Sequence, residues 1–143
     1  MGDVPQLLCQ AGAFVFLLLG VAHGLMTLLD LRRPHFFAPR DRQLIQALRQ
    51  TSIGLSPRAN FWLVWLGFNL SHSLGLITFG SGLIWLASVG GHAPGQAVIS
   101  GAGALVGVVD LILALRFWFR GPAIGCGIGA FSLALSYVVS QWG

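Results

Sequence analysis

Charged side chains are scarce in this chain of 143 residues, of which only 8% are charged. Lysine and glutamate are absent altogether, so all eight basic residues are arginine and all four acids are aspartate. Soluble domains are usually about a quarter charged, and the composition therefore excludes an ordinary soluble enzyme. It also excludes a disordered chain, because disorder requires few apolar residues and 55% of this chain is hydrophobic.

Cysteine is rare as well, since Cys9 and Cys126 stand alone inside apolar segments. A structural zinc site needs four clustered ligands, so we expect no metal site and treat both cysteines as small buried apolar residues. The net charge is +4, but nucleic-acid binding needs a basic surface in water. We therefore expect no nucleic-acid partner. The segment after Asp3 lacks the basic start of a cleaved signal peptide and is too long for one.

Four apolar segments make up most of the chain. They cover about residues 5–31, 60–88, 96–119 and 121–142. A helix needs about 20 mainly apolar residues to cross the hydrocarbon core of a bilayer, and these segments lack the alternation of barrel strands. The sequence therefore predicts an all-α fold, an integral membrane four-helix bundle, as a single transmembrane domain over residues 1–143.

The arginines predict an orientation in the membrane. The connection between the third and fourth segments holds Arg116 and Arg120, and the connection 89–95 holds no basic residue. The other six arginines lie between the first and second segments: Arg32, Arg33, Arg40, Arg42, Arg49 and Arg58. By the positive-inside rule, the 32–58 connection faces the cytoplasm and both termini lie outside.

Within the 32–58 connection, residues 41–49 predict a short cytoplasmic amphipathic helix. Leu44, Ile45 and Leu48 fall on one face, and Asp41 is placed to cap the N-terminus. Such a helix lies at the membrane surface with its arginines near anionic head groups. A structural strap that ties the first segment to the second is favoured over a partner-binding role for this helix.

Twenty glycines, many of them at helical spacing, form the other compositional signal. Small residues four apart let transmembrane helices approach closely, which predicts tight packing inside the bundle. The alternative is a homo-oligomer formed through the last stripe. The spaced sets are Gly20 and Gly24, Gly103 and Gly107, and Gly121, Gly125 and Gly129.

A few polar side chains fall inside the apolar segments. An ionisable group within a bilayer is costly unless it is paired or faces a cavity, so it marks a candidate functional site. At about 1.5 Å per residue, the histidines, the asparagine and the acid of the third segment reach similar depths. The predicted ligand-binding set is His23, Thr27, Asn69, His72 and Asp110. Asp30 is expected nearer the surface, paired with Arg32, Arg33 or Arg58, while His35 and His92 are expected in solvated connections.

Three strings carry a resemblance to small bacterial four-helix membrane proteins of hypothetical function: Ala22 to Asp30, Phe37 to Asp41 and Trp65 to Gly75. In size and helix number the chain is also similar to the DoxX-like proteins, some of which are tied to quinone or thiol redox. The resemblance implies a bacterial inner membrane, with both termini in the periplasm. It also implies that the motifs around His23 and around Asn69 and His72 carry the most weight. It supplies no established activity, since a fold alone does not fix function.

These observations leave several functions open. The first is a binding or accessory membrane protein that holds an apolar ligand with a polar head, such as a quinone, lipid or isoprenoid. The second is a small membrane enzyme, an isomerase or redox protein, that uses histidine and aspartate as acid and base. Haem b held by His23 and His72 is a further alternative. The chain could also dock in a larger membrane complex through its glycine stripes, and a transporter is the weakest option.

Overall fold

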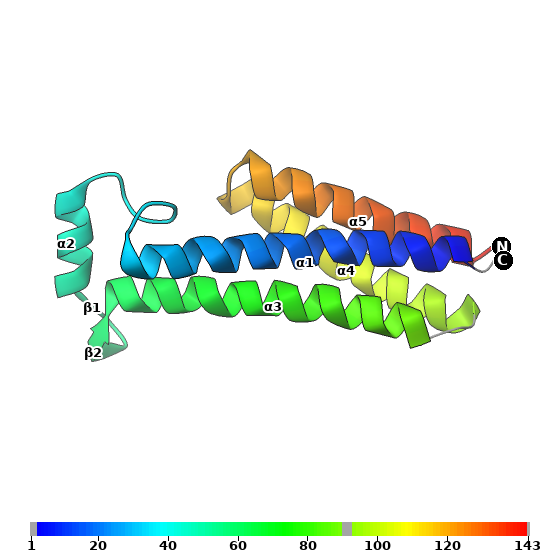
Figure 1. The fold of residues 1–143 in the computed structure, drawn as a ribbon, viewed down its shortest axis with the longest axis horizontal. Coiled ribbons are helices and arrows are strands. Elements are labelled where there is room, and N and C mark those ends of the chain that lie inside the picture. Colours follow the sequence, from blue (N-terminus) through cyan, green and yellow to red (C-terminus); the bar gives the residue numbers. More distant parts are fainter. Residues whose placement is uncertain (1–2, 90–92, 143) are drawn as a thin grey trace. The chain divides into compact units, whose positions relative to one another are not determined.

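The computed structural model describes residues 3–89 and 93–142 and consists mainly of four long helices (Figure 1). Each of the four is long and apolar enough to cross a membrane. The four apolar segments predicted from the sequence are therefore confirmed as helices, with small differences at their ends. The helices are α1 (Asp3–Arg32), α3 (Phe61–Val89), α4 (Ala93–Phe117) and α5 (Arg120–Ser140).

A short helix and a hairpin connect α1 to α3. The helix α2 (Arg42–Gln50) forms where the amphipathic pattern predicts it, and the Asp41 carboxylate caps it by accepting the Gln43 N–H at 2.8 Å. The antiparallel strands β1 (Ser52–Ile53) and β2 (Ser56–Asn60) follow. The sequence did not predict this hairpin, which is the exception to the all-α class. In Figure 1, α2 runs crosswise to the adjoining ends of α1 and α3.

Contacts group the chain into two compact units. Unit 1 combines the chain up to Leu19 with the chain from Leu76 onward, and unit 2 is Gly20–Gly75. The first part of α1, the last part of α3, and all of α4 and α5 therefore belong to unit 1. Unit 2 contains the rest of α1 and α3 together with α2 and the hairpin. The single transmembrane domain over residues 1–143 stays a prediction.

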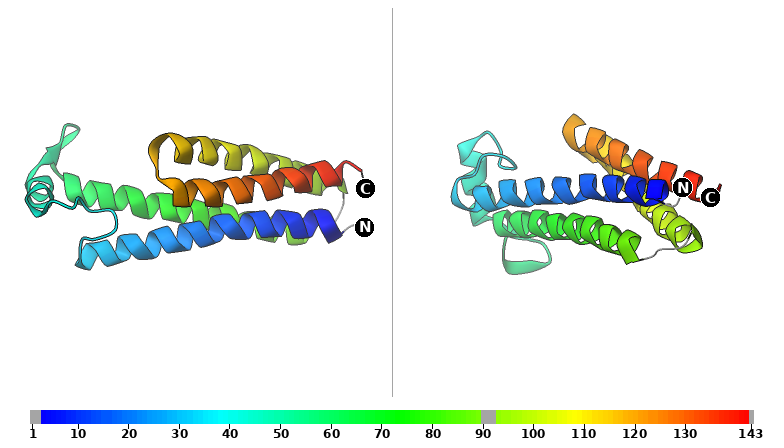
Figure 2. Two further views of the ribbon diagram at one scale, coloured as in Figure 1. Left: turned by 90° about the horizontal axis from the view of Figure 1, so that it is seen from above. Right: turned by 45° about the vertical axis from the view of Figure 1, so that its right-hand side comes forward.

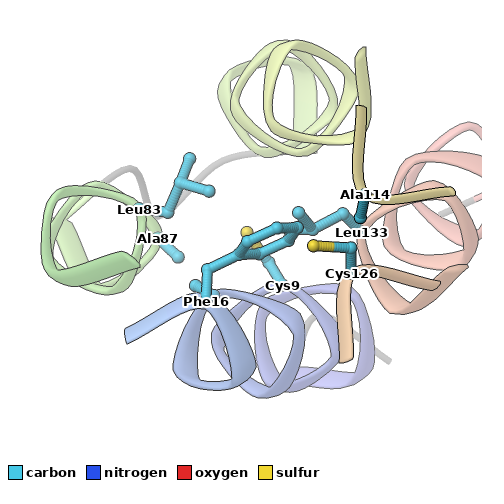
Figure 3. Close-up of a cluster of buried hydrophobic side chains, with 8 residues drawn as sticks. Cys9, Phe16, Leu83, Ala87, Ala114, Cys126 and Leu133 are labelled. Carbon is cyan, nitrogen blue, oxygen red and sulfur yellow. The ribbon is translucent and has the colours of Figure 1, made fainter. Parts of the chain in front are cut away.

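The core of unit 1 is built around the ring of Phe16, which is completely buried (Figure 3). Side chains from all four long helices surround this ring, and Phe79 meets it edge-on at 5.2 Å between centroids. As expected, both cysteines are free thiols buried in this apolar cluster. The cluster consists of Cys9, Ala13, Phe16, Leu83, Ala87, Ala114, Cys126 and Leu133.

Glycines bring the backbones of unit 1 close together. A Cβ atom at Gly80 would lie 2.6 Å from the Ala13 carbonyl oxygen and from the Leu17 nitrogen. A Cβ atom at Gly129 would lie 2.6 Å from the Phe16 ring, and one at Gly125 would lie 2.9 Å from Leu19. Internal packing therefore accounts for these glycines, whereas a homo-oligomer through the last stripe stays a prediction.

Two serine hydroxyls join α5 to the start of α1. Ser136 donates to the Pro5 carbonyl oxygen at 2.6 Å, and Ser132 donates to the Leu8 carbonyl oxygen at 2.8 Å. The later residue of α5, Ser136, contacts the earlier residue of α1, Pro5, so the two helices are antiparallel. Figure 2 likewise shows α4 and α5 side by side and antiparallel in both views. The start of α1 and the end of α5 therefore lie at the same end of unit 1.

Candidate functional site

The polar side chains of unit 2 gather where α1 and α3 approach each other closely. A Cβ atom at Gly24 of α1 would lie 3.3 Å from the Cβ atom of Ser73 in α3. Ser73 is buried, and its hydroxyl donates to the Asn69 carbonyl oxygen at 2.8 Å. Small side chains at this crossing let the longer polar side chains one turn away meet across the two helices.

His23 of α1 and Asn69 of α3 form the central hydrogen bond, with 2.9 Å between Nε2 and Oδ1. The Asn69 side chain is completely buried, and its Nδ2 donates to the Trp65 carbonyl oxygen at 2.7 Å. If the Asn69 amide were rotated by half a turn, its oxygen would face the Trp65 carbonyl oxygen. Both atoms are acceptors, so no hydrogen bond could form between them. The amide oxygen therefore faces His23, and His23 must donate through Nε2. In the neutral ring, Nδ1 is then the acceptor nitrogen.

His72 lies beside this pair. Its ring meets the His23 ring edge-on, with 5.4 Å between centroids and 77° between planes. On its own helix the His72 ring is almost parallel to Phe68, at 6.5 Å and 9°, and Phe68 is stacked on Trp65 at 6.3 Å and 20°. His72 and His23 are both half-buried, whereas Phe68 is 57% exposed. The two imidazoles thus sit beside an outward-facing aromatic column on α3.

Thr27 is brought to the same region, one turn after His23. Its side chain is fully buried, and its hydroxyl donates to the His23 carbonyl oxygen at 2.8 Å. Because the single hydroxyl proton goes to the backbone, Thr27 can meet a ligand only as an acceptor. Its observed contact fixes the helix around His23.

Asp30 has a role that differs from the expected ion pair with Arg32, Arg33 or Arg58. Its carboxylate is completely buried and accepts three backbone N–H groups of the connection that follows α1. Oδ1 accepts from His35 and Phe36 at 2.8 Å each, and Oδ2 accepts from Phe37 at 2.7 Å. The expectation of an arginine partner was wrong because a folded-back connection supplies the donors. Spacing along the sequence gave no signal for this turn.

The folded-back connection places Phe37 against the histidines. Its ring lies 4.4 Å from the His23 ring, at 32° between planes, and its carbonyl oxygen accepts from Trp65 Nε1 at 3.2 Å. Phe37 was not predicted as part of the site, although it falls in one of the strings that carry the family resemblance. His35 is exposed, as expected for a solvated connection, and His92 lies outside the described residues.

Asp110, the fifth residue of the predicted set, belongs to α4 and unit 1. It is half-buried and close enough to Cys126 for an electrostatic interaction. The structure therefore brings His23, Asn69 and His72 together in unit 2, with Thr27 one turn away. Asp110 is part of the other unit, so a carboxylate partner for the histidines stays a prediction.

Neither a metal site nor a haem site emerges from this geometry. Among residues 3–89 and 93–142, no three His, Cys, Asp or Glu side chains group as metal ligands. A bis-histidine haem needs one nitrogen of each ring to point at the iron from opposite faces of the porphyrin. His23 and His72 instead touch edge to face, and Nε2 of His23 is bonded to Asn69. This arrangement does not fit a haem between the two rings.

Comparisons of the chain with protein-family models, with curated proteins and with solved structures give no match. Any functional proposal therefore depends on the geometry of the residues themselves. Two half-buried imidazoles, one of them oriented by a buried amide, form the strongest such geometry in the described chain.

Proposed function

We propose that this chain is a small polytopic protein of the bacterial inner membrane whose His23–Asn69–His72 cluster binds an amphiphilic ligand. The ligand has an apolar tail and a hydrogen-bonding head, as a quinone, a lipid or an isoprenoid does. The observation that carries the proposal is the half-buried histidine pair with its buried amide partner. Polar groups inside a membrane segment are costly and are kept where they bind or react.

The depth of the cluster in α1 supports an amphiphilic ligand. His23 precedes Arg32 by nine residues, so it lies about 13 Å along the helix from that arginine at 1.5 Å per residue. The hydrocarbon region is about 30 Å thick, so a head group held there lies inside it, in the cytoplasmic half. The exposed aromatic rings of Trp65 and Phe68 on α3 offer an apolar surface for the adjoining part of the molecule.

The hydrogen bond that His23 makes to an uncharged amide supports binding, and acid–base catalysis by histidine and aspartate is the alternative. Unit 2 contains only Asp30 and Asp41. Both carboxylates accept backbone N–H groups, one in the connection after α1 and the other at the start of α2. A histidine that works as a general base is usually oriented by a carboxylate. Here the orienting group of His23 is an uncharged amide.

The proposed test is ligand retention by the purified protein. Wild type and the variant His72→Leu are purified in a mild detergent, and bound molecules are extracted and identified by mass spectrometry. We expect wild type to retain one class of amphiphile well above its share of the membrane. Loss of a buried hydrogen bond of about 1.4 kcal/mol predicts about tenfold weaker retention by His72→Leu.

The matched control is His35→Leu, which removes an exposed histidine of the same unit and is expected to retain the molecule like wild type. If wild type carries only bulk lipid, in the same proportions as His72→Leu, the binding proposal is wrong. Reproducible protein partners in place of a bound molecule would favour an accessory subunit. The visible absorption spectrum of the same sample detects a flavin or haem directly.

A further inference from the structure

The α2–hairpin segment, residues 41–60, exposes apolar side chains in an unusual way. No residue of α2 is buried, and Leu44 on its apolar face is 48% exposed. Leu55, at the turn of the hairpin, is 96% exposed. A strap that only joined α1 to α3 would bury this face against those helices. Ile45 and Leu48 of the same face are half-buried, but Leu44 and Leu55 stay exposed. These exposed leucines suit an apolar environment outside the segment.

The α2–hairpin segment is also held as one piece. At the end of α2, the Thr51 carbonyl oxygen accepts from the Phe61 N–H at 2.9 Å, and Asn60 Nδ2 donates to the Arg49 carbonyl oxygen. Asn60 Oδ1 accepts the Leu63 N–H at 3.1 Å at the start of α3. These bonds fix α2 and the hairpin to the start of α3, with α2 crosswise to that helix (Figure 1). Crosswise is the orientation of a helix that lies in a membrane surface.

The net charge of this region is positive, because six arginines stand against two acids. The two nearby acids, Asp30 and Asp41, both accept backbone N–H groups and so are already engaged. Around them stand six exposed arginines, two within α2, one on β2 and three before α2: Arg42, Arg49, Arg58, Arg32, Arg33 and Arg40. Guanidinium groups match phosphate oxygens in a two-pronged geometry. Exposed apolar side chains and exposed arginines occur together in this region. This combination suits a bilayer surface, where anionic head groups cover an apolar layer of acyl chains.

We propose that the α2–hairpin segment is a docking surface for the anionic phospholipid head groups of the surrounding bilayer. Leu44 and Leu55 enter the boundary between head groups and acyl chains, and the arginines bind the lipid phosphates. Arg42 and Arg49 lie on α2 itself, so their side chains reach the head-group layer when α2 lies flat. This role is separate from the ligand site at His23 and His72 and goes beyond the function proposed for that site.

The test uses the full chain with an environment-sensitive fluorophore on Leu55→Cys, reconstituted in vesicles of phosphatidylcholine with or without phosphatidylglycerol. Cys9 and Cys126 are buried, and wild type treated with the same reagent measures background labelling. In phosphatidylglycerol vesicles we expect blue-shifted emission and quenching by brominated lipid. Both effects should shrink in 1 M salt, where the screening length falls to about 3 Å. The double variant Arg42→Gln and Arg49→Gln should remove the dependence on phosphatidylglycerol.

The matched control is Gln46→Cys, an exposed position on the polar face of α2, which should stay accessible to water in both vesicles. A water-exposed label at position 55 in both vesicles would overturn the proposal. So would a shift of equal size with and without phosphatidylglycerol, because insertion would then not depend on anionic head groups. A blue shift without quenching by brominated lipid would point to a protein contact and would also overturn it. Repeating the measurement on His72→Leu separates this result from the fate of the ligand proposal.

Discussion

At the scale of single residues, Asp30 and Asn69 show how polar groups inside apolar helices are fixed by their neighbours. The Asp30 carboxylate gathers three N–H groups of the connection after α1, and Asn69 joins the Trp65 carbonyl to the His23 ring. Both side chains are completely buried. Each one positions a second group of the candidate site, namely Phe37 and His23.

Removing the Asp30 carboxylate should release the folded-back connection. Hydrogen bonds to a charged group contribute about 1.5–3 kcal/mol each, and buried donors left without a partner are costly. We expect Asp30→Ala to lower the free energy of unfolding in detergent by about 3 kcal/mol or more. The matched control Asp41→Ala removes one exposed N-cap bond and should cost about 1 kcal/mol. Equal losses in the two variants would show that the three bonds to Asp30 contribute little.

At the scale of elements, the helices could be predicted and the hairpin could not. Runs of more than 20 apolar residues leave few alternatives to a helix in a membrane, so the spans were found to within a few residues. Asp41 followed by the apolar face of Leu44 and Leu48 was enough to place α2. The strands of the hairpin are too short for a periodicity signal, and Pro57 on β2 weakens a strand prediction further.

Some residues of the candidate site could likewise be predicted from the sequence, and others could not. His23, Asn69 and His72 could be assigned because their depth follows from helix rise, about 1.5 Å per residue. Their meeting then depends only on which helices are neighbours. Phe37 and the true partners of Asp30 could not be assigned, because they depend on the path of a connection with no repeating pattern. Spacing identified Gly129 as a packing glycine but not Gly80, whose close contacts are with backbone atoms of Ala13 and Leu17.

The close approach of α1 and α3 in unit 1 leads to a prediction about the stability of two glycine variants. A Cβ atom at Gly80 would meet backbone atoms of Ala13 and Leu17 at 2.6 Å, whereas a Cβ atom at Gly82 would meet nothing within 4 Å. Gly80→Ala should therefore push the helices apart and destabilise by about 1–3 kcal/mol. Gly82→Ala should be neutral or stabilising by up to about 1 kcal/mol, because alanine favours helix. Thermal unfolding of both variants in one detergent decides this, and equal midpoints would contradict the packing at Gly80.

At the scale of the whole molecule, the hydrogen bonds from Ser132 and Ser136 to the start of α1 bring the two ends of the chain to one side. An even number of membrane crossings requires the same result. Which side this is follows only from the arginines. With six of eight between the first two apolar segments, the positive-inside rule assigns the ends to the outer face and the α2–hairpin segment to the cytoplasm.

Cysteine labelling of intact cells with a membrane-impermeant thiol reagent tests this orientation. Trp142 is 87% exposed near the end of α5, and Gln46 is exposed on α2, so a cysteine at either position is accessible from its own side. Trp142→Cys should be labelled in intact cells, and Gln46→Cys only after the membrane is permeabilised. The native thiols are buried, so wild type gives the background. The reverse pattern would place the six arginines outside and would remove the cytoplasmic lipid surface as their partner. Three long helices, α3, α4 and α5, separate α2 from Trp142, so the two positions lie on opposite sides if all three cross the membrane. Labelling of both positions in intact cells would therefore mean that α3, α4 and α5 do not all cross it.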